Sequence, residues 1–461
     1  MKRWLTLGVA ALAVCPAAAP AQGNFLEDIA AKYSNAVAVV QYTLAIETGD
    51  RIVSGEAICI SSANGLGVFL TAALDPQMQT SQLKDFQLVC PGPEGKTIKA
   101  KLLGVDAWTG LGFVQSLEKH DWQVVQFSAS SRLKLGQQVG SIGVLVADPA
   151  HPVCVGTAYV GAMLRVPGDL VYVTGGRLTG ACSPVFTSDG RAVGIVGQQL
   201  FLGYQTPTRQ GMAGLQLRSG QEAAFFTPVE EFVHVLKSIP SDGQASRLAW
   251  IGVNKFEAVT PEVADALKLT QPAIKVDEVI PNEPAAKAGL GNRDIVVELN
   301  GQPIEKLATP QLTVQNFVRL LTRMPEGTKV ALKVLTGAKP REVAITLGRM
   351  PKRPAEAERY FNRALGLLVR EKVPLDEYLG KSETARVPGL LVMGVVKDSP
   401  SADAGLRGDD LITNVNNQPV KTREVFAQIV EKSLAANPKA AINFLVRRGP
   451  DAQVIVVKPA E

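Results

Sequence analysis

Val279–Leu290 reads VIPNEPAAKAGL, and Val395–Leu406 reads VVKDSPSADAGL. The two stretches align without a gap, and the same offset continues to match residues further along both copies. The further matches are Asp294 with Asp410, and Asn300–Pro303 (NGQP) with Asn416–Pro419 (NNQP). Chance does not give so many identities in one register, so the second half of the chain is predicted to hold two copies of one module.

Each copy has the same order of local structure. A β-rich run comes first, and a proline (Pro284 or Pro400) then stands where a short helix begins. An Ala-Gly-Leu stop, an aspartate, an apolar run and an Asn-containing turn follow. This order predicts a small α+β unit in each copy.

The repeated unit resembles the PDZ domain in its bacterial, protease-associated form. Trp250–Val253 (WIGV) and Ala364–Leu367 (ALGL) stand where that family has its carboxylate-binding loop, and Thr313–Met324 and Thr422–Leu434 where it has the helix lining the groove. The resemblance implies that a peptide C-terminus is held by loop amides while the peptide adds to a sheet edge. The alternative is that each glycine only permits a tight turn in a scaffold module. The implied peptide-binding residues are Trp250, Ile251, Gly252, Val253, Leu365, Gly366 and Leu367.

The front of the chain has a different pattern. Short β-type runs interrupted by turns fill Ala36–Leu202 in two successive sets, which is typical of two β-barrels. An amphipathic stretch over Asn24–Tyr33 predicts a helix before them. Polar, Pro-containing links over 238–246 and 350–355 separate the parts. The predicted organisation is a signal peptide at 1–22, a barrel domain at 24–237, and modules at 247–350 and 355–461.

Two barrels followed by two PDZ-like units resemble the HtrA/DegP family of exported serine proteases. Phe69–Leu74 (FLTAAL), Leu103–Leu111 (LGVDAWTGL) and Thr179–Pro184 (TGACSP) resemble that family's active-site segments in order and spacing. The resemblance implies a mainly β fold, a trypsin-like double β-barrel followed by two PDZ domains.

The departures from the family fall on its catalytic triad, which needs histidine, aspartate and serine. In register, these positions hold Leu74, Gly110 and Ala181, so the sequence predicts a pseudoprotease and no enzyme, with an active serine endopeptidase as the alternative. Cys182 is a second possible nucleophile, but no histidine precedes it at the position that a base requires. The histidines of the chain are His120, His151 and His234.

The first residues resemble an export signal, because Lys2 and Arg3 precede an apolar run and Ala19–Ala21 is a small-residue cleavage site. A retained anchor and a lipoprotein signal ending at Cys15 are the alternatives. An exported chain favours disulfides among the remaining cysteines. More than one pairing is possible, and we favour pairs within each half of the front domain, Cys59 with Cys90 and Cys154 with Cys182. No spacing of cysteine and histidine indicates a metal site, and no cofactor is expected.

The net charge of +5 is spread along the chain without a basic run, which argues against nucleic-acid binding. We therefore expect an HtrA-like, non-catalytic protein of the periplasm or cell envelope that binds peptides or unfolded protein termini in a scaffold, chaperone-like or regulatory role. A homo-oligomer or an HtrA-like protease partner is plausible, and no integral membrane domain is expected. An active endopeptidase in protein quality control, or a regulatory subunit of such a protease, are the alternatives.

Overall fold

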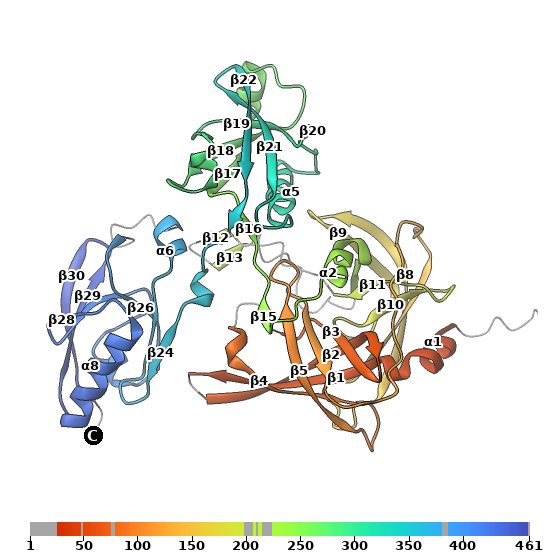
Figure 1. The fold of residues 1–461 in the computed structure, drawn as a ribbon, viewed down its shortest axis with the longest axis horizontal. Coiled ribbons are helices and arrows are strands. Elements are labelled where there is room, and N and C mark those ends of the chain that lie inside the picture. The colour runs from red at the N-terminus through yellow and green to blue at the C-terminus, as the bar shows by residue number, and fades with distance from the viewer. Residues whose placement is uncertain are drawn as a thin grey trace, which may run out of the picture.

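The computed structural model describes residues 25–47, 49–74, 79–197, 206–208, 211–213, 224–379 and 386–459. The predicted signal peptide at 1–22 lies outside these ranges. Three bodies are visible in Figure 1: the front domain in red to yellow-green, the first module in green and cyan, and the second module in blue. The predicted mainly β fold, with two barrels ahead of two α+β modules, is confirmed.

The first barrel is a sheet closed by a pairing between β5 and β6, in the order β5-β4-β1-β2-β3-β6. Its strands alternate buried and exposed residues, as a sheet with one solvated face requires. Phe69 and Leu88 are fully buried in its core. The strands are β1 (Val37–Ile46), β2 (Gly49–Ala63), β3 (Leu66–Thr71), β4 (Leu83–Val89), β5 (Thr97–Val105) and β6 (Gly112–Ser116), with η2 (Thr80–Gln82) before β4.

The second barrel closes in the order β10-β11-β14-β9-β8-β7. The helix α1 (Phe25–Tyr33), followed by η1 (Ser34–Ala36), packs near β7, and one apolar cluster joins residues of both barrels, including Leu70 and Phe186. The strands are β7 (Gln138–Val144), β8 (Val153–Arg165), β9 (Asp169–Arg177), β10 (Pro184–Thr187), β11 (Ala192–Val196) and β14 (Phe225–Pro228). Two further strands, β12 (Thr206–Thr208) and β13 (Gly211–Ala213), pair with each other.

The front domain ends in η5 (Val229–Glu231) and α2 (Val233–Lys237), and β15 (Gln244–Ala245) then adds to β5 in parallel. The first module follows, with a sheet in the order β17-β18-β19-β21-β22. Its elements are β16 (Ala249–Trp250), β17 (Val253–Ala258), α3 (Pro261–Ala266), β18 (Ile274–Val279), α4 (Pro284–Lys287), β19 (Ile295–Leu299), β20 (Gln302–Pro303), α5 (Pro310–Thr322), β21 (Lys329–Thr336), β22 (Lys339–Thr346) and β23 (Gly348–Arg349).

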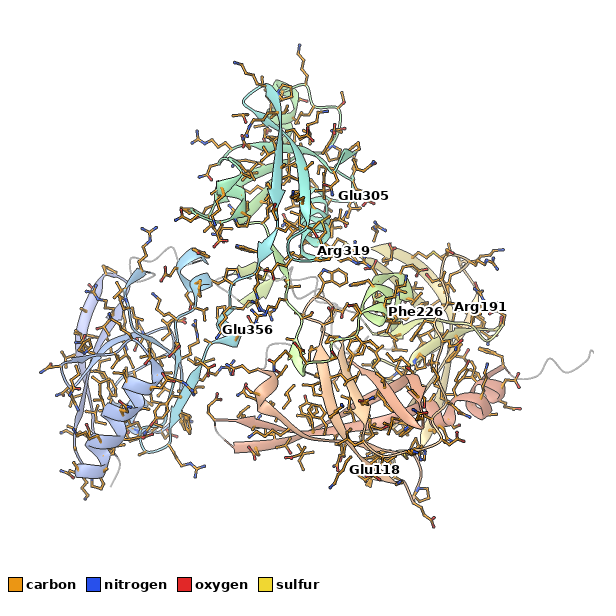
Figure 2. The ribbon with its side chains drawn as sticks, in the orientation of Figure 1. Glu118, Arg191, Phe226, Glu305, Arg319 and Glu356 are labelled. Carbon is orange, nitrogen blue, oxygen red and sulfur yellow. The ribbon has the colours of Figure 1, made fainter. Side chains whose placement is uncertain are left out.

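The second module has the sheet order β24-β25-β26-β27-β29-β30, which begins with a strand that the first module's sheet lacks. Its elements are η6 (Pro354–Glu356), β24 (Arg359–Asn362), β25 (Leu367–Glu371), α6 (Pro374–Leu379), β26 (Leu390–Val395), α7 (Pro400–Asp403), β27 (Leu411–Val415), β28 (Gln418–Pro419), α8 (Arg423–Ala436), β29 (Ile442–Arg448) and β30 (Asp451–Val457). The connection between the modules touches the front domain, where the side chain of Gln79 donates to the carbonyl of Ala357 at 3.0 Å, next to Glu356 (Figure 2).

The short helices begin where the sequence predicts, since Pro284 and Pro400 stand in the first turns of α4 and α7. The longer helices α5 and α8 are capped by threonines. The hydroxyl of Thr309 accepts from the amide of Leu312, and that of Thr422 accepts from the amide of Val425. The caps fix the start of the helix that lies beside each candidate groove.

The predicted disulfides do not form. The four cysteines in the described ranges are free thiols, namely Cys59, Cys90, Cys154 and Cys182. The thiol of Cys59 is directed at the carbonyl of Ser61, 3.3 Å away, and the thiol of Cys182 at the carbonyl of Leu70, 3.8 Å away. Burial raises the pKa of both thiols. These cysteines act as small buried side chains of the core and the seam between the barrels.

Candidate functional site

The loop before β17 is built around a left-handed glycine. Gly252 has φ of +83°, and a Cβ there would lie 2.3 Å from Cβ of Glu283. Two backbone hydrogen bonds fix the loop, because the amide of Ile280 donates to the carbonyl of Gly252 and the amide of Ala285 donates to that of Ile251. Position 252 therefore requires glycine for two reasons, its left-handed backbone and the lack of room for a Cβ.

The carbonyls of Ile251 and Gly252 accept hydrogen bonds, whereas the amides of the same residues do not donate one within the described chain. Among the residues that the structure describes, the amides of Ile251 and Gly252 have no acceptor. Val253, the next residue, begins the edge strand β17, and its side chain is buried. Loop amides without an acceptor beside a strand edge are the arrangement that receives a peptide carboxylate.

The candidate peptide groove beside this loop lies where β17 and α5 pack together. No strand of the described chain pairs with the outer edge of β17, which ends its sheet. The ring of Phe256 on β17 meets that of Phe317 on α5, with centroids 5.2 Å apart and planes at 81°. These rings join β17 to α5 within the core of the domain, while Trp250, before the loop, packs against residues of the second module.

The second module repeats the loop. Gly366 has φ of +63°, and a Cβ there would lie 2.3 Å from Cβ of Ser399. The amide of Val396 donates to the carbonyl of Gly366, and the amide of Ser401 to that of Leu365. These are the same two supports as in the first module. Leu367 then begins β25, which is paired on both edges, with β24 and with β26.

The three triad positions lie around the seam between the barrels. Leu74 is 2% exposed and packs against Gly112, where a Cβ would lie 2.2 Å from its Cδ1. Gly110 has φ of +76° in a turn in which its amide donates to the carbonyl of Asp106. Ala181 is exposed in the turn before β10.

A buried carboxyl lies at this seam, and the sequence reasoning missed it. The hydroxyl of Ser183 donates to Oε1 of Glu56 at 2.5 Å, and Oε2 has no hydrogen-bond partner among the described residues. Glycines make room for the carboxyl, because a Cβ at Gly143 or Gly180 would lie 2.6 or 2.7 Å from its oxygens. Burial raises the pKa of Glu56 to about 8, against the opposing hydrogen bonds from Ser183 and the backbone of Val144. The sequence feature that could have predicted this buried carboxyl is a glutamate inside an apolar strand between two glycine-rich segments.

The histidines lie apart from Cys182. His120 is near Cys90, with Nε2 3.9 Å from Sγ, and His151 is buried in a turn after β7. His234 lies on α2, where its Nδ1 accepts from Arg323 at 2.9 Å. Burial, with the nearby Arg323 as the next cause, lowers the pKa of His234 to about 4. None of the three histidines is positioned as a base for the thiol of Cys182.

The helix that lines the first groove also contacts the front domain (Figure 2). Arg319 on α5 forms an ion pair with Glu231 of η5 at 2.5 Å, and the exposed rim of this contact has a second pair, Arg165 with Glu305. The indole of Trp108 lies 5.0 Å from the guanidinium of Arg323. The groove helix is thus shared between two domains.

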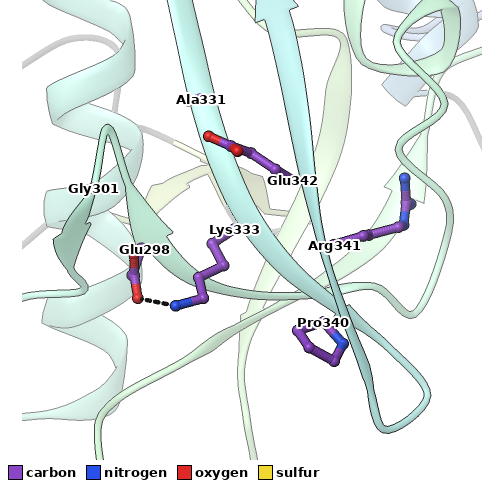
Figure 3. Close-up of a pocket in the computed structure, with 7 residues that line it drawn as sticks. All are labelled: Glu298, Gly301, Ala331, Lys333, Pro340, Arg341 and Glu342. Carbon is purple, nitrogen blue, oxygen red and sulfur yellow. Dashed lines mark hydrogen bonds and ion pairs between the residues drawn. The ribbon is translucent and has the colours of Figure 1, made fainter.

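A separate hollow lies on the first module, on the strands β19, β21 and β22 (Figure 3). Two of its charges are paired with each other, since Lys333 donates to Glu298 at 2.6 Å. It is lined by Glu298, Gly301, Ala331, Lys333, Pro340, Arg341 and Glu342. This hollow is on other strands than the groove of β17 and α5.

Known proteins resemble both halves of the chain. Residues 256–347 and 391–447 each match a family described as PDZ domain. A protein of Pseudomonas putida (strain GB-1) named "Probable periplasmic serine endoprotease DegP-like" is 30% identical over 383 residues, 79% of this chain and 72% of that protein. A protein of the same name from Hahella chejuensis is 27% identical over 369 residues, 78% of this chain and 73% of its own length.

Solved structures agree in fold. The HtrA-type protease AlgW with a decapeptide superposes with a TM-score of 0.51 at 18% identity, over 71% of this chain and 99% of that one. The same protease with a tripeptide gives 0.51 at 20% identity, over 72% and 99%. No helix in the described ranges is long and apolar enough to cross a membrane.

These comparisons correct one prediction. The expectation that the chain is a pseudoprotease and no enzyme is contradicted, because the curated relatives are named serine endoproteases and nothing in the structure demonstrates a loss of activity. That expectation rested on the residues at Leu74, Gly110 and Ala181, and on the lack of a histidine that could act as the base for Cys182. An alignment to the family's catalytic triad considers only three positions. It does not consider other polar groups at the same seam, such as Ser183 and Glu56.

Proposed function

Because the chain belongs to the HtrA/DegP family, with a trypsin-like domain and two PDZ domains, we propose that it binds the C-terminal ends of peptides and unfolded proteins through its first PDZ domain. We place this activity in protein quality control in the periplasm or cell envelope, the compartment named for its relatives. The observation that carries the proposal is the edge of β17, which pairs with no described strand, beside a loop whose amides at Ile251 and Gly252 have no acceptor among the described residues.

The chemistry of such a site follows from these groups. A peptide laid against β17 gains main-chain hydrogen bonds along the edge, and its terminal carboxylate accepts from the loop amides. The half-buried ring of Phe256, which packs on the buried ring of Phe317, favours a hydrophobic last residue. Trp250, Ile251, Gly252 and Val253 are therefore proposed as the peptide-binding loop.

Fluorescence anisotropy with a labelled decapeptide that ends in a free hydrophobic residue tests this function. We expect binding to the full chain, and a loss of about tenfold or more when the peptide is amidated at its C-terminus, because the carboxylate contact is gone. Gly252→Ala should weaken binding similarly through backbone strain and the clash with Glu283.

Gly291→Ala is the matched control in the same domain, where a Cβ would meet only Asp294 Oδ2 at 3.6 Å. Equal binding of the free and amidated peptides, or equal effects of the two glycine substitutions, would contradict the proposed site.

A second candidate function is peptide hydrolysis in the front domain, favoured by the names of the relatives and by the pair formed by Ser183 and Glu56. A hydroxyl within hydrogen-bonding distance of a carboxyl is the arrangement of a nucleophile and a base. Because burial raises the pKa of Glu56 to about 8, this carboxyl would act as a base mainly at alkaline pH. Both side chains are buried, so a substrate would reach them only if the loop at 179–183 moves.

Cleavage of an unfolded protein substrate tests this candidate. Ser183→Ala and Glu56→Gln should both abolish cleavage if the pair is responsible, while Ser130→Ala, which removes a hydroxyl that donates to Glu230 instead, should not. Cleavage that persists in both seam variants assigns the activity to other residues, and no cleavage by the unmodified chain rejects this candidate.

A further inference from the structure

The two PDZ domains differ at the edge that would receive a peptide. In the first domain, the strand just before the loop, β16, pairs with β23 instead of β17, so no described strand pairs with the outer edge of β17. In the second domain, the strand before the loop, β24, turns back and pairs antiparallel with β25. The register joins Arg359 to Arg370 and Asn362 to Leu367. The main-chain groups of β25 that a peptide would use are therefore already bonded.

The strand β24 also contacts the helix that forms the other wall of the groove. The ring of Tyr360 meets that of Phe426 on α8 at 5.9 Å, and its hydroxyl donates to Glu431 at 2.9 Å. The guanidinium of Arg423, at the start of α8, donates to the carbonyl of Arg359 at 3.4 Å. β24 thus lies between β25 and α8, the two elements between which an added peptide strand binds.

The loop amides of the second domain are occupied as well. The amide of Leu365 donates to Oδ1 of Asn362 at 3.0 Å, and the amide of Gly366 donates to the carbonyl of Arg363 at 3.2 Å. In the first domain, the equivalent amides have no acceptor among the described residues. A side-chain amide oxygen from β24 thus takes the place that a peptide carboxylate would take.

From these contacts we infer that β24 is an internal ligand of the second PDZ domain, which stays closed until this strand is displaced. The strand has only four residues, and the side chains of Arg359, Tyr360 and Phe361 are only half-buried, so its release exposes little apolar surface. The affinity of the domain for an external peptide is then lowered by the fraction of molecules in which β24 is released. This inference rests on the same loop chemistry that is proposed for the first domain.

The test counts peptides bound by the full chain, using calorimetry with the decapeptide that carries a free hydrophobic C-terminus. We expect about one peptide per unmodified chain, in the first domain, and about two after β24 is loosened by Tyr360→Ala with Asn362→Gly. Phe361→Pro, which removes a main-chain donor from β24, is a second way to release the strand. Arg363→Ala, an exposed turn residue of the same hairpin, is the matched control and should leave the count unchanged.

Hydrogen exchange in the same samples shows whether the domain remains folded. The amides of β25 should lose protection in both release variants, while those of β27 in the sheet interior should keep it. Two peptides per unmodified chain would overturn the inference, and so would a released β25 that gains no peptide. If neither variant exposes β25, the strand is a permanent part of the sheet and the inference is also overturned. A failure of the first domain to bind is seen separately, as the absence of the first peptide in every sample.

Discussion

The guanidinium of Arg319 lies 2.5 Å from the carboxylate of Glu231, and each side chain is 4% exposed. Arg319 belongs to α5, the helix that lines the groove of the first PDZ domain, and Glu231 belongs to the front domain. The second oxygen of Glu231 accepts from the amide of Asp169 at 2.9 Å. The groove helix is therefore anchored on the trypsin-like domain by a buried ion pair. Both carboxylate oxygens of Glu231 accept a hydrogen bond.

Replacing Arg319 by leucine should detach the first PDZ domain from the front domain. The substitution leaves Glu231 buried without its cation, which costs about 3–5 kcal/mol. We expect faster cleavage of the link at 238–246 in limited proteolysis, with the fold of each domain kept by circular dichroism. Arg165→Ala removes the exposed pair with Glu305 and should cost at most about 1 kcal/mol. Equal cleavage rates in the two variants would contradict this anchoring role.

Acidification should loosen the same contact through His234. In the docked state the pKa of His234 is about 4, lowered first by burial and then by Arg323, whereas the ordinary value is 6.5. The undocked state therefore binds the proton more readily. Docking is at full strength above pH 6.5 and weakens as the pH falls toward 4, by up to about 1.4 kcal/mol per pH unit.

The indole of Trp108, whose ring centroid is 5.1 Å from that of His234, reports this change. Its fluorescence should shift between pH 6.5 and 4 in the unmodified chain and stay constant in His234→Phe. The opposing charges near His234 are Asp106, which favours the proton, and Arg319, which disfavours it. An identical titration in the histidine variant would show that another group controls docking.

The repeat was the part of the fold that the sequence could predict best. Pattern and local chemistry agree there, since Pro284 and Pro400 begin helices and the glycines at 252 and 366 both have positive φ. The all-β front domain was predicted from the spacing of its runs, and its two closed barrels were found. Local signals of this kind depend on residues close in sequence, which is why they can be read without a structure.

The contacts on which the proposed functions rest were harder to predict, because they join residues distant in sequence. Glu56 and Ser183 come from different barrels, and Arg319 and Glu231 from different domains. The occupied edge of β25 could not be predicted either, since both domains have a short segment before the loop and only pairing distinguishes them. The disulfide prediction failed for a related reason, because cysteine count and compartment do not determine where a thiol points.

The aspartates matched in the repeat should be essential for folding of their domains. Asp410 is 1% exposed and accepts from Arg448 at 2.6 and 2.8 Å, and from the amide of Arg407 at 3.0 Å. Asp410→Asn leaves the cation without its partner, so we expect a loss of roughly 2–4 kcal/mol in the unfolding of the second PDZ domain. Urea unfolding followed by hydrogen exchange of β27 measures this. Asp409→Asn, the exposed neighbour, is the control, and equal losses at both positions would contradict the role.

Glu56 should make the front domain less stable as the pH rises. Burial raises its pKa to about 8 in the folded state, against 4.5 as the ordinary value. Between these two values the folded state holds a proton that the unfolded state has released, so the free energy of unfolding falls with increasing pH, by up to about 1.4 kcal/mol per pH unit. Above pH 8 both states are ionised and the slope from this group vanishes.

Glu56→Gln removes the charge, keeps an oxygen that can accept from Ser183, and should abolish this slope. Thermal unfolding of the front domain at pH values from 5 to 8 measures it, and the variant should gain stability over the unmodified chain most strongly at pH 8. Glu118→Gln, which replaces an exposed carboxyl of the first barrel (Figure 2), is the matched control and should leave the slope in place. If the slope survives in Glu56→Gln, the carboxyl is already ionised in the folded state, and a deprotonated Glu56 would then be a stronger acceptor for the Ser183 hydroxyl at neutral pH.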